Sequence, residues 1–122
     1  MAAPSRTRAY RRGLAGETRA VLALMIKGYR IVARRARTGA GEIDIVAVRG
    51  STVAIVEVKA RADLTSALEA VGPATQARLV RAAAAWLPRH PSYRDHTIRF
   101  DIMVVRPCRW PTHIVNAFEA RS

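Results

Sequence analysis

The stretch that most restricts the fold is GEIDIVAVRGSTVAIVEVKAR, residues 41–61. Two apolar, largely β-branched runs flank Gly50-Ser51, a pair typical of a two-residue hairpin turn. The second run is apolar on both faces, which predicts a strand in the interior of a sheet. Charged residues nevertheless interrupt these apolar runs, and they are Asp44, Glu57 and Lys59.

The turn also predicts which residues of the two strands face each other. A two-residue loop pairs Arg49 with Thr52, and the same register places Asp44 opposite Glu57. Directly opposed residues have Cβ atoms roughly 4.5–5.5 Å apart, and two carboxylates at that distance repel each other. We therefore expect a positive group between these two acids.

A divalent cation would relieve this repulsion. Magnesium binds oxygen ligands at about 2.0–2.1 Å, accepts one or two carboxylates and keeps several waters. We expect Asp44 and Glu57 to bind Mg²⁺ or Mn²⁺, with the backbone carbonyl of Val58 as a further ligand. Glu17 is an acid on an otherwise apolar helical face, and it could approach the same cation from the side.

Lys59 shares a strand face with Glu57, about 6.5–7 Å along the strand. The chain contains 19 arginines and only 2 lysines, so a lysine at this position is informative. A lysine ammonium is a compact charge whose pKa shifts on burial, and it can orient or deprotonate an attacking water. The alternative is structural: Lys59 would form an ordinary ion pair with Glu57 or with Glu42.

The rest of the chain predicts one α/β domain over residues 9–122, preceded by a flexible basic arm over residues 1–8. A frayed terminus without a role is the alternative for the arm. Helices packed on a mixed sheet of four or five strands, in the order α-β-β-β-α-β-(β), follow from the patterns. The expected elements are a helix over 8–27 ended by Gly28, a strand over 29–35, a glycine-containing loop over 37–41, the two hairpin strands, an ambiguous segment over 63–72, a helix from Pro73 to about Leu87, a strand over 97–105 and a short strand near 112–118.

Composition narrows the partner and the compartment. A formal net charge of +12, spread along the chain, favours a polyanion, with nucleic acid preferred to a membrane surface. The alternative is a generally arginine-rich surface without a specific partner. Cys108 is the single cysteine, which excludes an internal disulfide and fits a reducing cytoplasm. The longest aliphatic run, Val21–Ile26, is too short to cross a bilayer.

Asp44 followed thirteen positions later by Glu57-Val58-Lys59 resembles the core motif of the PD-(D/E)XK nuclease superfamily. A closer resemblance is to the YraN-like family of small, uncharacterised bacterial proteins, and it covers nearly the whole chain after the arm. The segments that carry it are GLAGE at 13–17, GEIDIVA at 41–47, VEVKAR at 56–61, RFD at 99–101 and NAF at 116–118.

The resemblance implies a restriction-endonuclease-like fold, similar to that of Holliday-junction resolvases. It implies Asp44 and Glu57 as metal ligands and Lys59 beside the attacking water, and it adds Gln76 as a polar companion of the site. Resolvases make paired cuts, so the resemblance also suggests a homodimer. The chain departs from the family pattern in having Arg34-Arg35 where an asparagine is frequent, and Thr75 where a basic residue is frequent.

Three functions remain open from the sequence. The first is a magnesium-dependent endonuclease that binds DNA rather than RNA and hydrolyses phosphodiester bonds, with branched DNA as the substrate by analogy. The second is a non-catalytic nucleic-acid-binding module of the same fold, acting in a repair or ribosomal complex. The third is a structural partner of an acidic protein. For the first two, the residues expected to bind the phosphate backbone are Arg34, Arg35, Arg37, Arg61 and Arg78, with Gln76 beside them.

Overall fold

The centre of the protein is a mixed five-stranded sheet whose strands lie in chain order. The computed structural model describes the backbone of residues 2–120 and the side chains of residues 13–120. Strands β3 and β4 run parallel, and the other neighbouring pairs are antiparallel. The α/β class and the element order expected from the sequence are confirmed. The strands are β1 (Arg30–Thr38), β2 (Gly41–Arg49), β3 (Thr52–Ala60), β4 (Thr97–Val105) and β5 (Thr112–Phe118).

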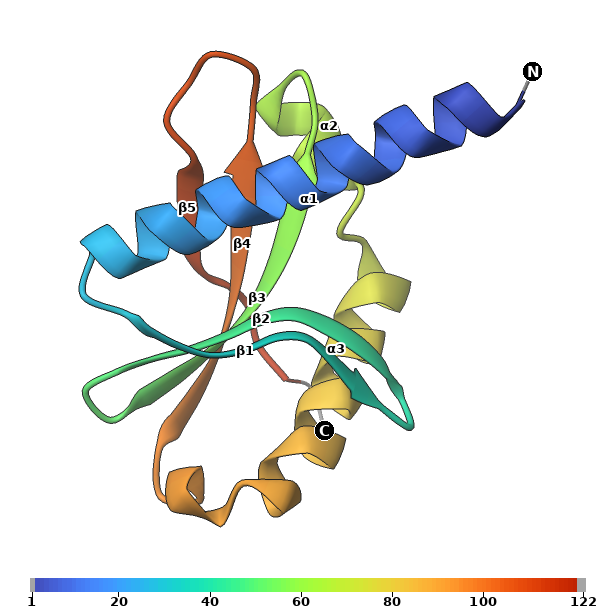
Figure 1. Cartoon of the computed structure of the whole chain (residues 1–122). Coiled ribbons are helices and arrows are strands. Elements are labelled where there is room, and N and C mark those ends of the chain that lie inside the picture. Colours follow the sequence, from blue (N-terminus) through green and yellow to red (C-terminus); the bar gives the residue numbers. More distant parts are fainter. Residues whose placement is uncertain (1, 121–122) are drawn as a thin grey trace.

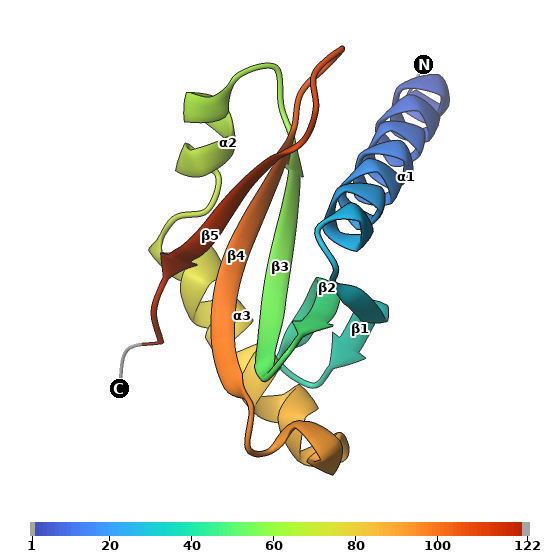
Figure 2. The ribbon, with the colours of Figure 1, turned by 90° about the vertical axis from the view of Figure 1, so that its left-hand side faces the viewer.

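Helices cover the two faces of this sheet, which gives three layers (Figures 1 and 2). Helix α1 (Ala2–Ile26) lies on one face and α3 (Pro73–Trp86) on the other. The alternation of side chains along β2 and β3 supplies both cores: Ile45 and Val56 pack toward α1, whereas Val46 and Ile55 pack toward α3. Each such fully buried side chain contributes roughly 1.5–3 kcal/mol.

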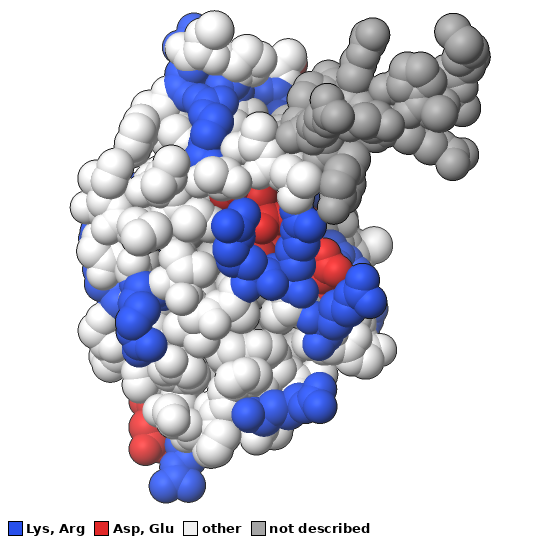
Figure 3. Space-filling view, in the orientation of Figure 1, with Lys and Arg blue, Asp and Glu red and all other residues white. Residues whose placement is uncertain are grey.

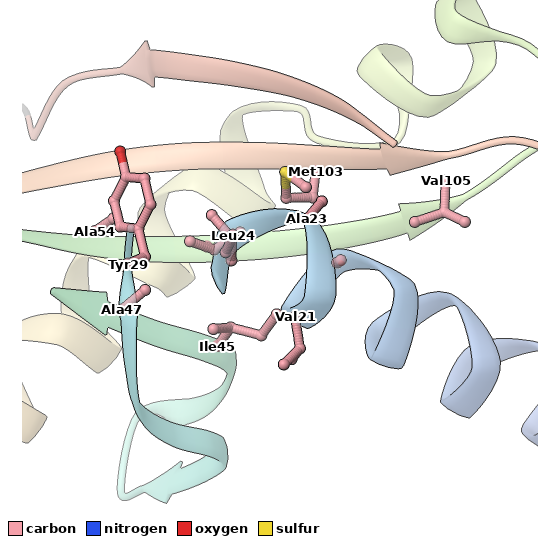
Figure 4. Packing of buried hydrophobic residues seen from close by; sticks show 11 residues of the cluster. Val21, Ala23, Leu24, Tyr29, Ile45, Ala47, Ala54, Met103 and Val105 are labelled. Carbon is pink, nitrogen blue, oxygen red and sulfur yellow. The ribbon is translucent and has the colours of Figure 1, made fainter. Parts of the chain in front are cut away.

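The core under α1 fixes the position of this helix over the sheet (Figure 4). Val21 and Leu24 point from α1 toward Ile45 of β2 and Met103 of β4. Gly28, at φ +90°, ends the helix as the sequence predicts, and the N–H of Gly28 donates to the carbonyl of Met25 at 2.9 Å. Glu17 lies one turn before Val21 on the same face of α1 and is likewise buried.

Two segments differ from the sequence-based expectation. Helix α1 runs back to Ala2, so residues 2–8 of the expected arm are helical, and the mobility of the arm stays a prediction. The ambiguous segment contains a short helix, α2 (Leu64–Glu69), whose N-cap Asp63 accepts a hydrogen bond from the N–H of Ser66. In the described part of the chain, no helix combines the length and the apolar character needed to cross a membrane.

Candidate functional site

The site lies where β2 separates from β3. The Gly50-Ser51 turn pairs Arg49 with Thr52 as predicted, and this register continues to Ile45 and Val56. That pair is the last in the described ladder, so the backbone pairing expected between Asp44 and Glu57, and between Glu42 and Lys59, does not form there. Beyond it the β1–β2 hairpin bends away from β3, as Figure 1 shows.

We call the place where β2 separates from β3, beyond Ile45 and Val56, the fork. Asp44 connects the two strands there through its side chain instead of its backbone. Its Oδ2 accepts a hydrogen bond from the N–H of Val58 at 2.8 Å. In a strand, the N–H and C=O of one residue point to the same side, so we expect the carbonyl of Val58 to face the fork as well. The carboxylate of Asp44 thus replaces the ladder bond that β2 would otherwise make with β3.

The charge of Asp44 is poorly compensated. Burial and the neighbouring carboxylate of Glu57 raise the pKa of Asp44 from 3.8 to about 7, although the hydrogen bond from Val58 opposes this shift. Among the ion pairs between described side chains, none includes Asp44. The structure therefore brings Asp44 and Glu57 into interaction, without a cationic side chain paired to Asp44.

Glu57, in contrast, has two cationic partners. Its side chain is 4% exposed, and its Oε2 lies 3.4 Å from Nζ of Lys59 and 3.3 Å from Nη2 of Arg78. The ion pair with Lys59 is the structural alternative raised by the sequence, and it is present. A pair of Lys59 with Glu42 is not among the described ion pairs; Oε2 of Glu42 lies 3.8 Å from Nε of Arg37.

Arg78 has a role that the sequence did not reveal. It was expected to bind phosphate, but it reaches from α3 across the fork, donating to the carbonyl of Glu42 at 3.0 Å and to Glu57. Gly41 makes room for it, since a Cβ on Gly41 would lie 3.1 Å from Cγ of Arg78. A glycine at the start of β2 was the available signal, and the φ of +138° at Gly41 accounts for it equally well.

On the side of the sheet that α1 covers, two arginines hold Glu17. Its side chain is 9% exposed, and its two oxygens accept from Nε of Arg34 at 3.0 Å and from Nε of Arg35 at 3.1 Å. Arg35 has a φ of 51°, which is uncommon for a residue other than glycine. Glu17 was expected as a further metal ligand, and in this arrangement its carboxylate is used by Arg34 and Arg35.

A cavity of about 520 Å³ lies between α1 and the β1–β2 hairpin. Both Glu17 and Asp44 line it, together with Arg35, Arg37 and Glu42. Figure 3 shows the face of the molecule that carries α1 and this hairpin, where small acidic patches are flanked by basic side chains. The lining residues are Gly13, Leu14, Glu17, Arg35, Arg37, Glu42, Asp44, Val58 and Ala60.

The remaining residues expected at the site lie around it. Arg37 is almost fully exposed at the rim of the cavity. Arg61 is exposed and bonds the carbonyl of Ala60, next to a second hollow on the far side of α1. Gln76 donates to the carbonyl of Val71 at 3.0 Å, so it stabilises the start of α3 and does not line the cavity.

The oxygen atoms available here fit a cation such as Mg²⁺, which takes only a few of its ligands from the protein. Within the described residues, no three acidic, histidine or cysteine side chains lie close enough to hold a metal by themselves. Magnesium does not require them, since one or two carboxylates, waters and substrate phosphates complete its shell. Asp44 and Glu57 supply two carboxylates, of which Asp44 carries the uncompensated charge, and the carbonyl of Val58 is expected on the same side of β3.

Comparison with known proteins identifies the family. The model of Uncharacterised protein family UPF0102 matches residues 16–105. The chain belongs to this family. It is 52% identical over 118 residues to a UPF0102 protein of Mesorhizobium japonicum, covering 97% of this chain and 94% of the relative. It is 53% identical to one of Rhodopseudomonas palustris strain BisA53, covering 98% and 92%.

Membership in UPF0102 confirms the resemblance to the YraN-like family drawn from the sequence. The matched segment begins one residue before Glu17 and contains the fork, Lys59 and Arg78, but it ends before β5. The family carries no assigned activity in its description, so a function for this chain has to be argued from the chemistry of the site.

Proposed function

We propose that this member of UPF0102 is a metal-dependent nuclease that hydrolyses phosphodiester bonds in nucleic acid, with branched DNA as the substrate. The observation that carries the proposal is the pair Asp44 and Glu57 at the fork between β2 and β3, with Lys59 next to Glu57. A pKa of about 7 for a half-buried aspartate indicates an electrostatic deficit that a cation would fill.

Asp44, Glu57 and the carbonyl of Val58 are the groups that would hold magnesium or manganese. When bound, such a cation polarises the phosphodiester and lowers the pKa of the attacking water. Asp44 would be held in place by the N–H of Val58, and Glu57 by Lys59 and Arg78. Two anchored carboxylates reduce the reorganisation needed when the substrate arrives.

Lys59 would act on the water and on the phosphate. Its side chain is 21% exposed and its Nζ lies 3.4 Å from Glu57, so it is fixed beside the carboxylates while its ammonium can still reach solvent. In hydrolysis the water oxygen bonds to phosphorus, the bond to the leaving sugar oxygen breaks, and that oxygen takes up a proton. Lys59 would orient the water and stabilise the negative charge that develops on the phosphate.

The basic surface supports a nucleic-acid substrate. Arg34, Arg35 and Arg37 lie close together along β1, Arg35 and Arg37 line the cavity, and the formal net charge of the chain is +12. An arginine guanidinium group can bind two phosphate oxygens at once, and each neutralised phosphate makes binding more sensitive to salt. A four-way junction is resolved by two cuts, so this substrate would engage two copies of the chain.

Cleavage assays test the proposal directly. Labelled linear, flap and four-way-junction DNA and structured RNA would be incubated with magnesium, manganese or a chelator. We expect metal-dependent cleavage that Asp44→Asn and Glu57→Gln reduce by at least about 100-fold, with binding retained. Asp95→Asn, an exposed acid in the loop before β4, is the matched control and should cleave like the wild type.

One observation favours the second candidate, a non-catalytic nucleic-acid-binding module. Glu57 is already compensated by Lys59 and Arg78 without any cation, as in a structural ion-pair cluster. Binding of every substrate without cleavage, in either metal, would replace the nuclease by this module. Metal-dependent cleavage lost in both fork variants, but kept in Asp95→Asn, would reject the module.

A further inference from the structure

The arrangement of Arg34 and Arg35 around Glu17 is unusual for a strand. Side chains of consecutive strand residues point to opposite faces, so two neighbouring arginines should not meet the same group. Here both do: Nε of Arg34 lies 3.0 Å from one oxygen of Glu17, and Nε of Arg35 lies 3.1 Å from the other. The left-handed backbone of Arg35, at φ 51°, breaks the alternation and lets the two guanidinium groups converge.

Two converging guanidinium groups form a site for an anion with at least two oxygens. A carboxylate meets this requirement, and so does a phosphodiester, whose two unesterified oxygens carry a similar charge. Glu17 occupies this site from within the chain. Both arginines remain 37–43% exposed on their side chains, whereas Glu17 is 9% exposed, so an anion from solvent can reach the arginines.

The surroundings of Glu17 offer it a second position. It lines the cavity of about 520 Å³ together with Asp44, so its side chain borders open space on the side of the fork. Helix α1 is anchored below it by Ala20, Val21 and Leu24, which stay buried against the sheet. A rotation of the Glu17 side chain therefore needs no movement of the helix.

We propose that Arg34 and Arg35 bind one phosphodiester group of the nucleic acid, and that Glu17 occupies this phosphate site in the free protein. The arriving phosphate takes over the two guanidinium groups, and Glu17 turns into the cavity toward Asp44, where it adds a third carboxylate to the fork. This inference rests on the proposed function, because it assumes a nucleic-acid ligand and a cation at Asp44 and Glu57.

The exchange makes two binding events depend on each other. Nucleic acid releases Glu17 toward the fork and thereby raises the affinity for the cation, and by linkage the cation raises the affinity for nucleic acid by the same factor. In the absence of metal, Glu17 only competes with phosphate. An ordinary structural ion pair predicts neither effect, and this difference distinguishes the two interpretations.

The first experiment measures competition without metal. A fluorescein-labelled four-way junction is titrated with wild-type protein, Glu17→Gln and Glu42→Gln in chelator, and binding is followed by anisotropy. We expect Glu17→Gln to bind about tenfold more tightly than the wild type. Glu42 lines the same cavity and contacts Arg37 but neither Arg34 nor Arg35, so Glu42→Gln controls for loss of one negative charge and should change affinity by about twofold at most.

The second experiment asks whether the gain acts through the two arginines. In Arg34→Gln/Arg35→Gln, adding Glu17→Gln should no longer tighten binding, because the phosphate site has been removed. This triple variant leaves no unpaired carboxylate at position 17, so it remains testable even if the double variant unfolds. The triple variant is compared with Arg34→Gln/Arg35→Gln or, if that protein unfolds, with Arg34→Gln. If the triple variant still binds the junction tenfold more tightly than this reference, the proposal is overturned.

The third experiment measures linkage with Mn²⁺ as the probe. Calorimetric titration of the wild type should show about tenfold tighter Mn²⁺ binding when a junction with uncleavable phosphorothioate linkages is present, and Glu17→Gln should lose this gain. Equal junction affinity of wild type and Glu17→Gln, together with cleavage by the wild type, overturns the exchange and leaves the nuclease. Tighter binding by Glu17→Gln without cleavage by any variant supports the phosphate site and rejects the nuclease. No junction binding by either protein rejects both.

Discussion

Two aspartates of the same sheet have opposite electrostatic environments. Asp101 of β4 is fully buried, yet hydrogen bonds lower its pKa to about 2; Asp44 of β2 is only partly buried, yet its pKa is raised to about 7. Burial alone raises the pKa of both groups, so the difference comes from their partners. The acid with uncompensated negative charge, and not the most deeply buried acid, therefore marks the candidate site.

Asp101 is surrounded by three donor residues from β4 and β5. Burial raises its pKa, but hydrogen bonds from His113, Arg99 and the N–H of Asn116 outweigh burial. Lys27 of the segment after α1 lies 2.9 Å from Nδ1 of His113, which requires Nδ1 to accept, so Nε2 carries the proton that is donated to Asp101. This network ties the end of α1 to β4 and β5 and is complete without a ligand.

The largest expected effect follows from breaking the compensated site. Asp101→Asn removes the negative charge that Arg99 and His113 contact, and the amide nitrogen of the new side chain would face hydrogen-bond donors. We expect the free energy of unfolding to fall by about 3–5 kcal/mol, as for a buried ion pair that loses one partner. Denaturant unfolding at pH 7 measures this.

The same substitution at the other aspartate is the control for Asp101→Asn. Asp44→Asn keeps an acceptor for the N–H of Val58 and removes repulsion from Glu57, so it should be at least as stable as the wild type at pH 7. If Asp101→Asn is as stable as the wild type, or if Asp44→Asn loses as much unfolding free energy as Asp101→Asn, the distinction between the two sites is wrong.

The next effect is a pH dependence of opposite sign to ordinary carboxylates. Asp44 binds a proton more tightly in the folded state, with a pKa of about 7 against 3.8. Its stabilising contribution is therefore full below about pH 4 and is lost as the pH rises through about 7. Without metal, the stability of Asp44→Asn should exceed that of the wild type increasingly between pH 5 and pH 8, by about 2 kcal/mol at the upper end once solvent screening is included.

Urea unfolding of the two proteins at half-unit pH intervals checks this dependence. Asp101 titrates near pH 2 in the folded protein, below the range used, and it is present in both proteins. A constant difference between the two stability curves from pH 5 to pH 8 would show that Asp44 is compensated in the folded state. It would also remove the electrostatic reason for a cation at the fork.

The sequence predicted the elements and the register better than the site. The Gly50-Ser51 turn and the apolar runs around it are local signals, and they correctly place Ile45 opposite Val56. The end of the ladder beyond that pair is not local, because it results from the bend of the β1–β2 hairpin over the rest of the sheet. Asp44 therefore meets Glu57 through its side chain, not through a continued ladder.

The partners of the acids could not be read from the sequence for a similar reason. Arg34 and Arg35 reach Glu17 only because Arg35 adopts a left-handed backbone, which no glycine or asparagine at that position announces. Arg78 meets Glu57 from α3, 21 residues further along the chain. Patterns of period two or 3.6 assign residues to faces, but they do not predict which long side chains cross between elements.

The smallest effect concerns Arg78. It forms an ion pair with Glu57, whereas none of the described ion pairs includes Asp44. Arg78→Gln removes the contact with Glu57 and the charge-assisted bond to the carbonyl of Glu42, while Lys59 stays next to Glu57. We expect a loss of about 1–2 kcal/mol in unfolding free energy without metal. Saturating Mg²⁺ should stabilise every protein with an intact fork, but Arg78→Gln more than the wild type, because the cation replaces the missing charge. The deficit of Arg78→Gln relative to the wild type should therefore shrink, whereas the deficit of Asp101→Asn should not change.

Arg81→Gln, an exposed substitution one turn further along α3, is the matched control and should change the stability by less than about 0.5 kcal/mol with or without Mg²⁺. If Mg²⁺ stabilises Arg78→Gln no more than it stabilises the wild type, Arg81→Gln and Asp101→Asn, the cation does not replace the charge of Arg78 at Glu57. A recovery confined to Arg78→Gln ties the cation to the fork, because only there does the substitution leave a carboxylate short of positive charge.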